Sequence, residues 1–283
     1  MLPAGGGGSG GLGGGVAPQQ YTTISIPQRA IAICSNNSAQ PFPIQANTPF
    51  VLFGSGAGGG GGGGGQLAIQ QNGNVVTQQF MAGGAGGSGL AFVLRYSGFS
   101  VGVSVYTNCA VGGGGGGNQD CSNPNYLSPP FLGQPGQDAA NSVIYLQTPS
   151  QTYSLLLLGG KGGAGGFTQG QTSASSASGG LGYFAGADGG YWSCSHSVGT
   201  SNCTCPQGLP GTQGGASIFG PGSQNWPSPT TTFFQGALGS GGGGGGGGFS
   251  PMAGAFYTGS GGNSAAVYII LNPTPQELAS LGY

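Results

Sequence analysis

Glycine sets the first constraint on this chain, because 70 of its 283 residues are glycine and they recur in short runs along the whole length. Most runs adjoin an apolar segment with the composition of a β-strand. Ordering a residue costs about 1–2 kcal/mol of backbone entropy, and glycine loses the most freedom. Ordered runs therefore need partners that offset this cost. The runs are Gly5–Gly8, Gly10–Gly15, Gly58–Gly65, Gly83–Gly89, Gly112–Gly117, Gly159–Gly166, Gly241–Gly248 and Gly259–Gly262.

These runs have two interpretations, disordered linkers or ordered rods, and their recurrence along the chain favours rods. A polyproline-II-type helix has three residues per turn and no internal hydrogen bonds, so its backbone groups need neighbours. Without Cβ atoms, glycine runs can approach one another on all sides and bond laterally. Eight glycines span roughly 25 Å, the length of a seven- or eight-residue strand. We expect rods and strands in one domain; a glycine-rich β structure with loose loops is the alternative.

Strand-like segments greatly outnumber helical ones. The only helix expected is Pro275–Leu281, with Thr274 as its cap, and Asn72-Gly73 predicts a type I′ hairpin. The fold class expected is all-β with polyglycine-II helices, a glycine-rich sandwich or bundle flanked by short antiparallel strands, with almost no α-helix. The expected strands are Tyr21–Ile26, Ala30–Cys34, Phe50–Phe53, Gln66–Gln70, Val75–Phe80, Ala91–Tyr96, Val101–Tyr106, Ser142–Leu146, Tyr153–Leu158, Thr230–Phe234 and Ala265–Leu271.

Composition excludes several classes of protein. Three Lys and Arg residues and four Asp and Glu residues give a net charge of −1. Without a basic cluster, nucleic-acid binding is not expected. The 36% hydrophobic and 10% aromatic content is unlike that of disordered chains. No run of apolar residues is long enough to predict a membrane-spanning helix, and Met1–Ala4 has neither the basic nor the apolar region of a secretion signal.

Four segments, in this order, resemble the glycine-rich domains of phage tail-fibre tip adhesins and related virion proteins. They are a strand entering a glycine block at Phe50–Gly65, a second such unit at Tyr153–Gly166, a small-residue turn at Gly214–Gly220 and a closing strand within Gly259–Leu271. The resemblance implies a polyglycine sandwich whose loops bind a host surface molecule. The chain departs from those adhesins in lacking an evident fibre-attachment domain and in carrying six cysteines.

The resemblance covers residues 48–271 and divides the chain into three parts. We expect residues 48–271 to form the glycine-rich polyglycine and β domain. Residues 1–47 would be an N-terminal glycine-rich arm with strands, serving for attachment or assembly. Residues 272–283 would be a C-terminal tail with a short helix.

The cysteines form an even set that allows three disulfides in fifteen connectivities. Cys109 with Cys121 would close the loop that carries Gly112–Gly117, and Cys194 with Cys203 or Cys205 would close another. Disulfides favour an oxidising location, such as a virion exterior or an extracellular fibre; free buried thiols are the alternative. The candidates are Cys34, Cys109, Cys121, Cys194, Cys203 and Cys205.

A zinc site is the sharper alternative for part of this set, because Cys194, His196, Cys203 and Cys205 could supply four ligands. Known zinc motifs place two or more residues between paired cysteines, whereas these pairs have one. A disulfide-bonded surface loop is therefore the default, with His196 exposed to solvent. We expect no metal and no cofactor.

Catalysis is not expected either. A Cys–His dyad would again depend on His196, the only histidine, and no carboxylate lies near it in the sequence to orient it. Four acidic residues leave little scope for a carboxylate pair. Lys161 lies in Gly-Lys-Gly-Gly, which lacks the Gly-Lys-Ser/Thr ending of a P-loop. The chain is predicted not to be an enzyme.

Polar and aromatic loops between the rods are the candidate binding surfaces, since loops carry the side chains that can recognise a ligand. An aromatic ring with a polar edge provides a large contact area at low entropic cost. Packing between subunits or at the bundle ends is an equally good interpretation of these rings. The candidates are Tyr126, Phe131, Tyr191, Trp192 and Trp226.

These observations predict a structural virion surface protein, either a tail-fibre or receptor-binding tip or a fibre or capsid decoration. It would lie on the virion surface or outside the cell, and its partners would be copies of itself, other virion or fibre proteins and a host surface receptor. The first alternative is a subunit of an extracellular filament or matrix. An ice-binding protein is less favoured, because springtail antifreeze proteins resemble polyglycine bundles with more regular glycine spacing and no long aromatic loops.

Overall fold

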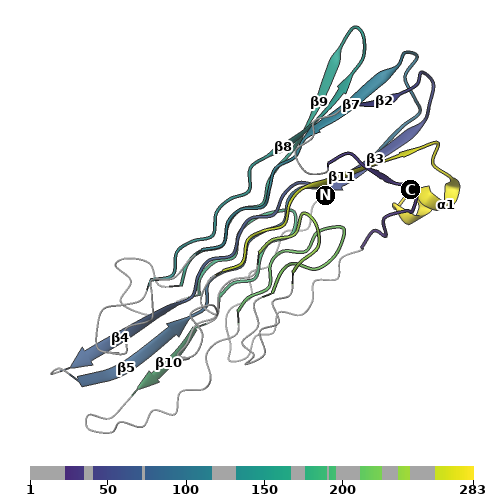
Figure 1. Cartoon of the computed structure of the whole chain (residues 1–283). Coiled ribbons are helices and arrows are strands. Elements are labelled where there is room, and N and C mark those ends of the chain that lie inside the picture. The colour runs from purple at the N-terminus through teal and green to yellow at the C-terminus, as the bar shows by residue number, and fades with distance from the viewer. Residues whose placement is uncertain are drawn as a thin grey trace.

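The structure, a computed structural model, describes residues 23–34, 41–71, 74–116, 132–166, 176–189, 191–195, 211–224, 235–242 and 259–283. Figure 1 shows an elongated molecule with strands gathered at its two ends and undulating, nearly parallel chain segments between them. No helix in these ranges is long and apolar enough to cross a membrane.

Three antiparallel sheets account for the strands. The first has the order β1 (Ile31–Ala32), β11 (Ala266–Leu271), β3 (Phe50–Ser55) and β6 (Ala91–Tyr96). The second has the order β2 (Phe42–Ile44), β7 (Val103–Asn108), β8 (Ser142–Gln147) and β9 (Thr152–Leu157). The third, at the other end of the molecule (Figure 1), has the order β10 (Tyr191–Ser195), β5 (Asn74–Met81) and β4 (Gly65–Gln71).

The predicted all-β class with almost no helix is confirmed over the described residues. The predicted strands correspond to β1, β3 to β9 and β11 within a few residues, and β4 and β5 pair as the Asn72-Gly73 hairpin requires. The strand expected at Tyr21–Ile26 is wrong over the described residues 23–26, where Ile24 makes one backbone bond, to Ile218 O. The strand expected at Thr230–Phe234 lies outside the described residues.

Two strands were not anticipated from the sequence. β2 is three residues long and contains Pro43, which lacks a backbone donor and argues against a strand unless that strand lies at an edge. β10 lies in the cysteine-containing segment for which a surface loop is predicted. Both are outermost strands of their sheets.

The first and second sheets pack face to face as a sandwich. In the second sheet, β7 and β8 alternate buried residues, which face the first sheet, with less buried residues. Apolar side chains from both sheets fill the space between them. The buried members are Ile44, Phe50, Leu52, Val103, Val105, Ile144, Leu146, Leu157, Val267 and Ile269.

The outer face of the first sheet is also covered, and β3 is therefore buried along its whole length. The helix α1 (Pro275–Ser280) contributes Leu278 to this second cluster, beside Val51, Phe53 and Ile270. Thr274 caps α1 and forms a capping box with Glu277, as the sequence predicts for the cap. The helix thus covers hydrophobic sheet surface rather than extending away as a tail.

Between the end sheets, the chain continues through glycine segments that bond sideways in a repeat of three. In the central segment, residues 56–64, the N–H groups of Gly58, Gly59 and Gly60 donate to three different segments, at Asn263, Gly87 and Gln137. The next three, Gly61 to Gly63, donate to the same three segments at the residues three positions earlier, Ser260, Gly84 and Gln134. Three is the period of a polyproline-II-type helix, whereas a strand has a period of two.

The carbonyl groups of the central segment meet three further segments. Gly113 N–H donates to Gly58 O, Gly163 N–H to Gly60 O and Gly242 N–H to Gly59 O, at 2.8–2.9 Å. Three neighbouring segments accept hydrogen bonds from the central segment and three others donate to it, so the central segment has six bonded neighbours. A β-strand bonds to two neighbours in one plane, so the chain passes here from sheets into a three-dimensional bundle.

The bundle keeps the strand register. β3 and β6 are paired with Ser55 opposite Ala91, the glycine bonds follow from Gly56 to Leu90 and from Gly62 to Gly84, and β4 and β5 resume with Gly65 opposite Met81. Each step of three along one segment is matched by three residues back along the other. The pairing of β8 with β9 continues into the bundle in the same way, through Ala139 to Gly160 and Gly136 to Gly163.

Close approach of backbones makes glycine necessary at inward positions. A Cβ atom added at Gly262 would overlap the carbonyl oxygen of Gly58, whereas one added at Gly261 would lie 3.4 Å from Gly113 O, an ordinary contact. Larger side chains occur at the outer surface of the bundle, where Val111 is 69% exposed and Leu181 is 73% exposed. The large side chains of Val111 and Leu181 therefore lie at the border of the lattice, whereas the small side chains of Ala57 and Ala85 are buried within it.

The neighbouring pair Gly261 and Gly262 tests this account. We expect Gly262→Ala to lower the free energy of unfolding by about 1–3 kcal/mol, because the new methyl group forces segments apart. The same substitution should also speed amide hydrogen exchange with solvent across residues 58–63. The control Gly261→Ala should change stability by less than about 1 kcal/mol, since it removes freedom only from the unfolded chain. Chemical denaturation followed by circular dichroism measures both, and equal losses would contradict lateral close packing.

Candidate functional site

The end of the molecule that carries the third sheet contains part of the predicted binding surface. Tyr191 and Trp192 lie in β10, where they are opposite Met81 and Phe80 of β5. The structure thus places these two candidates on a strand held by the glycine bundle, not in a loop. Tyr126, Phe131 and Trp226 lie outside the described residues, so their predicted role stays a prediction.

The zinc hypothesis concerns the same end of the molecule. Cys194 lies in β10 opposite Gln78, and His196, Cys203 and Cys205 lie outside the described residues. Within the described ranges, no three His, Cys, Asp or Glu residues lie close enough to hold a metal ion.

One disulfide is present in the described chain, and it differs from the expected pairing. Cys109 bonds to Cys34, with their Cα atoms 5.9 Å apart, so the proposed Cys109–Cys121 loop closure is wrong. Sequence proximity favoured Cys121. Cys34 instead lies beside Cys109 because the first sheet, which carries β1, packs against the second sheet, which carries β7. The bond joins the two layers where the sandwich passes into the bundle. Cys121 lies outside the described residues.

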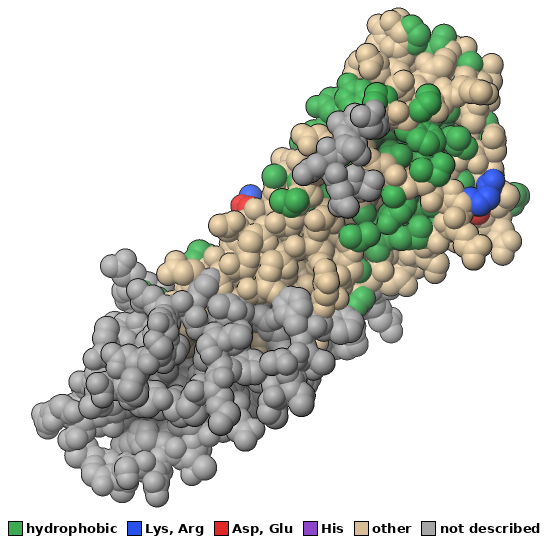
Figure 2. Space-filling view, viewed as in Figure 1, with side chains coloured by type: hydrophobic (Ala, Val, Ile, Leu, Met, Phe, Trp, Pro, Cys, Tyr) green, Lys and Arg blue, Asp and Glu red, His purple; other side chains and the backbone are tan. Residues whose placement is uncertain are grey.

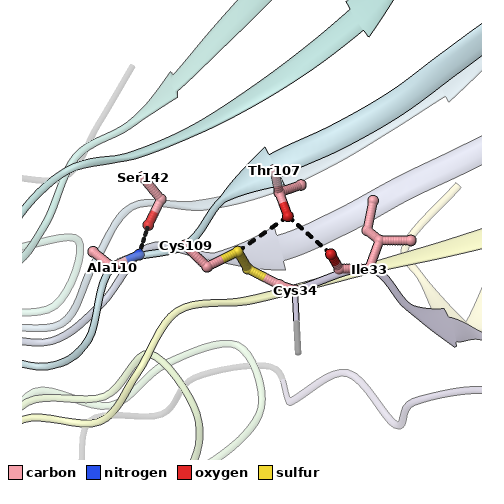
Figure 3. The surroundings of a disulfide bond; sticks show 6 residues. All are labelled: Ile33, Cys34, Thr107, Cys109, Ala110 and Ser142. Carbon is pink, nitrogen blue, oxygen red and sulfur yellow. Dashed lines mark hydrogen bonds between the residues drawn. A yellow bond between two sulfur atoms is a disulfide. The ribbon is translucent and has the colours of Figure 1, made fainter. Parts of the chain in front are cut away.

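Hydrogen bonds surround this disulfide on both sides (Figure 3). The Thr107 hydroxyl donates to Ile33 O at 2.8 Å and lies 3.2 Å from Cys109 Sγ. The Ala110 N–H donates to the Ser142 hydroxyl at 2.9 Å, which ties the start of one glycine segment to β8. The arrangement positions the backbone and provides no free thiol, since the two sulfur atoms are bonded to each other.

Charged groups of the described chain are mostly used in two ion pairs. Lys161 Nζ lies 2.7 Å from Asp138 Oδ2 on the bundle surface, and this contact, with the Gly162 N–H, holds the pKa of Asp138 below its usual value. Lys161 therefore bridges two segments of the bundle while its side chain stays largely exposed. Among the described residues on the face that Figure 2 shows, charged side chains appear at two places.

The second ion pair joins the N-terminal part of the described chain to α1. Arg29 donates to both carboxylate oxygens of Glu277, at 3.0 and 2.8 Å. Together with the Thr274 N–H, this contact lowers the pKa of Glu277 from 4.5 to about 2. Arg29 Nη2 also donates to Asn272 O. The pair holds the covering segments on the outer face of the first sheet.

Figure 2 shows apolar side chains of the described residues gathered over the sandwich. On the outer face of the second sheet, Tyr106 and Tyr145 are stacked with ring centroids 4.8 Å apart. Beside them Val143 is opposite Leu156, which is 51% exposed. This surface was not identified from the sequence. A signal was available, because four consecutive leucines after Ser154 cannot all face inward in a strand of period two.

The disulfide assignment gives a direct test. Non-reducing peptide mapping should recover a peptide pair joined through Cys34 and Cys109, and recovery of Cys109 joined to Cys121 would contradict the structure. Replacing both Cys34 and Cys109 with Ser should lower the free energy of unfolding by about 2–4 kcal/mol, because the bond closes a long loop in the unfolded chain. Denaturation under non-reducing conditions measures this loss.

The Arg29–Glu277 pair predicts a specific pH dependence. A folded-state pKa of about 2 against 4.5 means that the pair stabilises the fold fully above pH 4.5 and loses this effect as the pH falls toward 2. The melting temperature of the wild type should exceed that of Glu277→Gln near neutral pH, and the difference should shrink between pH 4.5 and 2. Arg29→Met should reduce the same pH-dependent part. A difference that is constant with pH would contradict the pair's role.

The described residues thus form a sandwich at one end and a three-stranded sheet at the other, joined by the glycine bundle, and no three His, Cys, Asp or Glu residues among them lie close enough to hold a metal ion. Comparison of the chain with protein-family models, curated proteins and solved structures found no match.

Proposed function

We propose that this chain is a structural protein of a virion surface, in which a rigid bundle of polyglycine-II helices separates an anchoring end from a displayed end. The observation that carries the proposal is the bonding of the central glycine segment to six neighbours with a repeat of three. Polyglycine-II is the backbone form with this period, and its packing needs no side chains. The glycine segments would therefore act as rigid rods.

The mechanism proposed is mechanical. Nine residues of the central segment, 56–64, span roughly 28 Å at the rise of a polyproline-II-type helix. Many bonds between neighbouring segments must break together before such a bundle bends. The sandwich would serve for attachment, and the far end, with Tyr191 and Trp192 on β10, would face the partner.

Three features support a virion surface in particular. The chain has few charges, which suits a permanent assembly. The Cys34–Cys109 disulfide is typical of an oxidising exterior. The order of strand and glycine units resembles that of tail-fibre tip adhesins. A tail-fibre tip, another receptor-binding tip and a capsid decoration all use a stiff spacer in this way, and the partners proposed are other virion proteins, copies of this chain and a host surface receptor.

An extracellular filament or matrix is the second candidate function. The observation that favours it is an open sheet edge at β9, because exposed strand edges promote growth by pairing with further chains. In this alternative the same stiff bundle would space repeating subunits instead of displaying a receptor-binding end.

Labelling of native material distinguishes the two. Gold-labelled antibodies raised against the purified chain should decorate the outside of intact virus particles from the source organism, and the chain should sediment with structural virion proteins. A peptide spanning residues 191–195 should compete for part of the labelling if that end is displayed. Labelling confined to cell-free filaments, with no virion proteins co-sedimenting, would overturn the virion proposal and favour the filament.

A further inference from the structure

The outer edges of the two four-stranded sheets are protected to different degrees. Unpaired N–H and C=O groups along an edge strand invite pairing with another chain, and proteins block them with proline, charge, short strands or covering segments. β2 contains Pro43, and β1 is only two residues long and is followed by the disulfide-bonded Cys34. Both edges on the β1 and β2 side are therefore blocked.

β6 is protected by charge and by the end of the chain. Gly56 N–H donates to Leu90 O, so in the ladder that follows the backbone groups of Ala91, Val93 and Arg95 point away from β3. Val93 O accepts a hydrogen bond from the Tyr283 hydroxyl at 3.1 Å, and Arg95 adds an exposed charge. A strand approaching this edge would have to displace the Tyr283 hydroxyl from Val93 O and remove the Arg95 side chain from water.

Over Thr152–Leu157, β9 has none of these protections in the described structure; the next residue, Leu158, already accepts a hydrogen bond from the Leu90 N–H. Its sequence, TYSLLL, contains no charged residue and no proline, and Leu156 is 51% exposed and Tyr153 44% exposed. The Thr148 N–H to Gln151 O bond closes the turn before β9, so the alternate pairs that follow leave the backbone groups of Thr152, Ser154 and Leu156 pointing away from β8. Figure 1 shows β9 at the margin of the sandwich.

We propose that β9 is a dimerisation edge, at which β9 of a second copy of this chain pairs antiparallel across a two-fold axis. With Ser154 of each copy on the axis, Thr152 of one copy lies opposite Leu156 of the other. The outward N–H and C=O groups of all three residues then have partners. The two second sheets become one continuous eight-stranded sheet, whose outer face carries the apolar surface at Val143 and Leu156.

A second copy is the occupant that fits best for three reasons. A two-fold pair uses the same surface on both partners, so the edge must be self-complementary, and an uncharged strand meets this condition without repulsion. Each copy carries a net charge of only −1. The bundle flank is the other large surface, but exposed Val111, Lys161 and Leu181 project from it and prevent backbones from approaching closely enough to extend the lattice.

The antiparallel pairing determines the shape of the dimer. β9 runs toward the glycine bundle in each copy, since residues 158–166 follow it. Two antiparallel β9 strands therefore direct the two bundles away from a shared central sandwich. The inference concerns assembly alone and does not depend on what the far ends bind.

Sedimentation equilibrium of the purified full chain tests the proposal with two variants and a control. Ser154→Lys places a charge opposite its like across the axis, and Ser154→Pro removes an outward N–H that β8 does not use. We expect the wild type to be a dimer at micromolar concentration and both variants to raise the dimer dissociation constant at least about 100-fold. The control, Ser104→Lys, lies in β7 opposite Pro43 and Gln147, away from the edge, and should remain dimeric.

Thermal melts followed by circular dichroism identify any variant that fails to fold, and the other variant then decides. A monomeric wild type would overturn the inference. Assemblies whose mass is unchanged in both folded β9 variants would also overturn it. Loss of the dimer in Ser104→Lys as strongly as in the β9 variants would show that the outer sheet face, not the edge strand, makes the contact, and would equally overturn it.

Discussion

Lateral hydrogen bonding between glycine backbones is the interaction on which the rest of the structure depends. Gly58 to Gly63 each donate a bond to a neighbouring segment, and three further segments donate back. These bonds replace the hydrophobic core along the middle of the molecule, where there are few side chains to bury. Strong backbone pairing is needed here because glycine loses more conformational freedom on ordering than any other residue.

The sandwich and the bundle hold neighbouring layers of the chain together at two different spacings. Sheets that pack through side chains lie about 10 Å apart, and Phe50, Val105 and Ile144 fill that gap at one end. Where the side chains end, the layers converge until backbones bond directly. The Cys34–Cys109 disulfide and the Ala110 to Ser142 bond lie at this transition and hold the layers together as the spacing changes.

Much of the fold could be predicted from local sequence. Alternating or continuous apolar segments predicted most strands, and Thr274 with Pro275 predicted the start of the helix, because each signal depends on neighbouring residues only. The candidate site was predicted less well. Sequence proximity suggested Cys121 as the partner of Cys109, and the outward leucine on β9 was overlooked, since both depend on which strands become neighbours.

The sequence by itself determined most of the strands, the positions of the glycine runs and that the chain has almost no helix. Only the tertiary structure decided which segments lie side by side, that the central glycine segment bonds to six neighbours, and which sheet edge stays open. A glycine run is the same at every position, so it holds no information about its own register. That information comes from the flanking strands, where pairs such as Ser55 with Ala91 align side-chain faces and carry one register into the bundle.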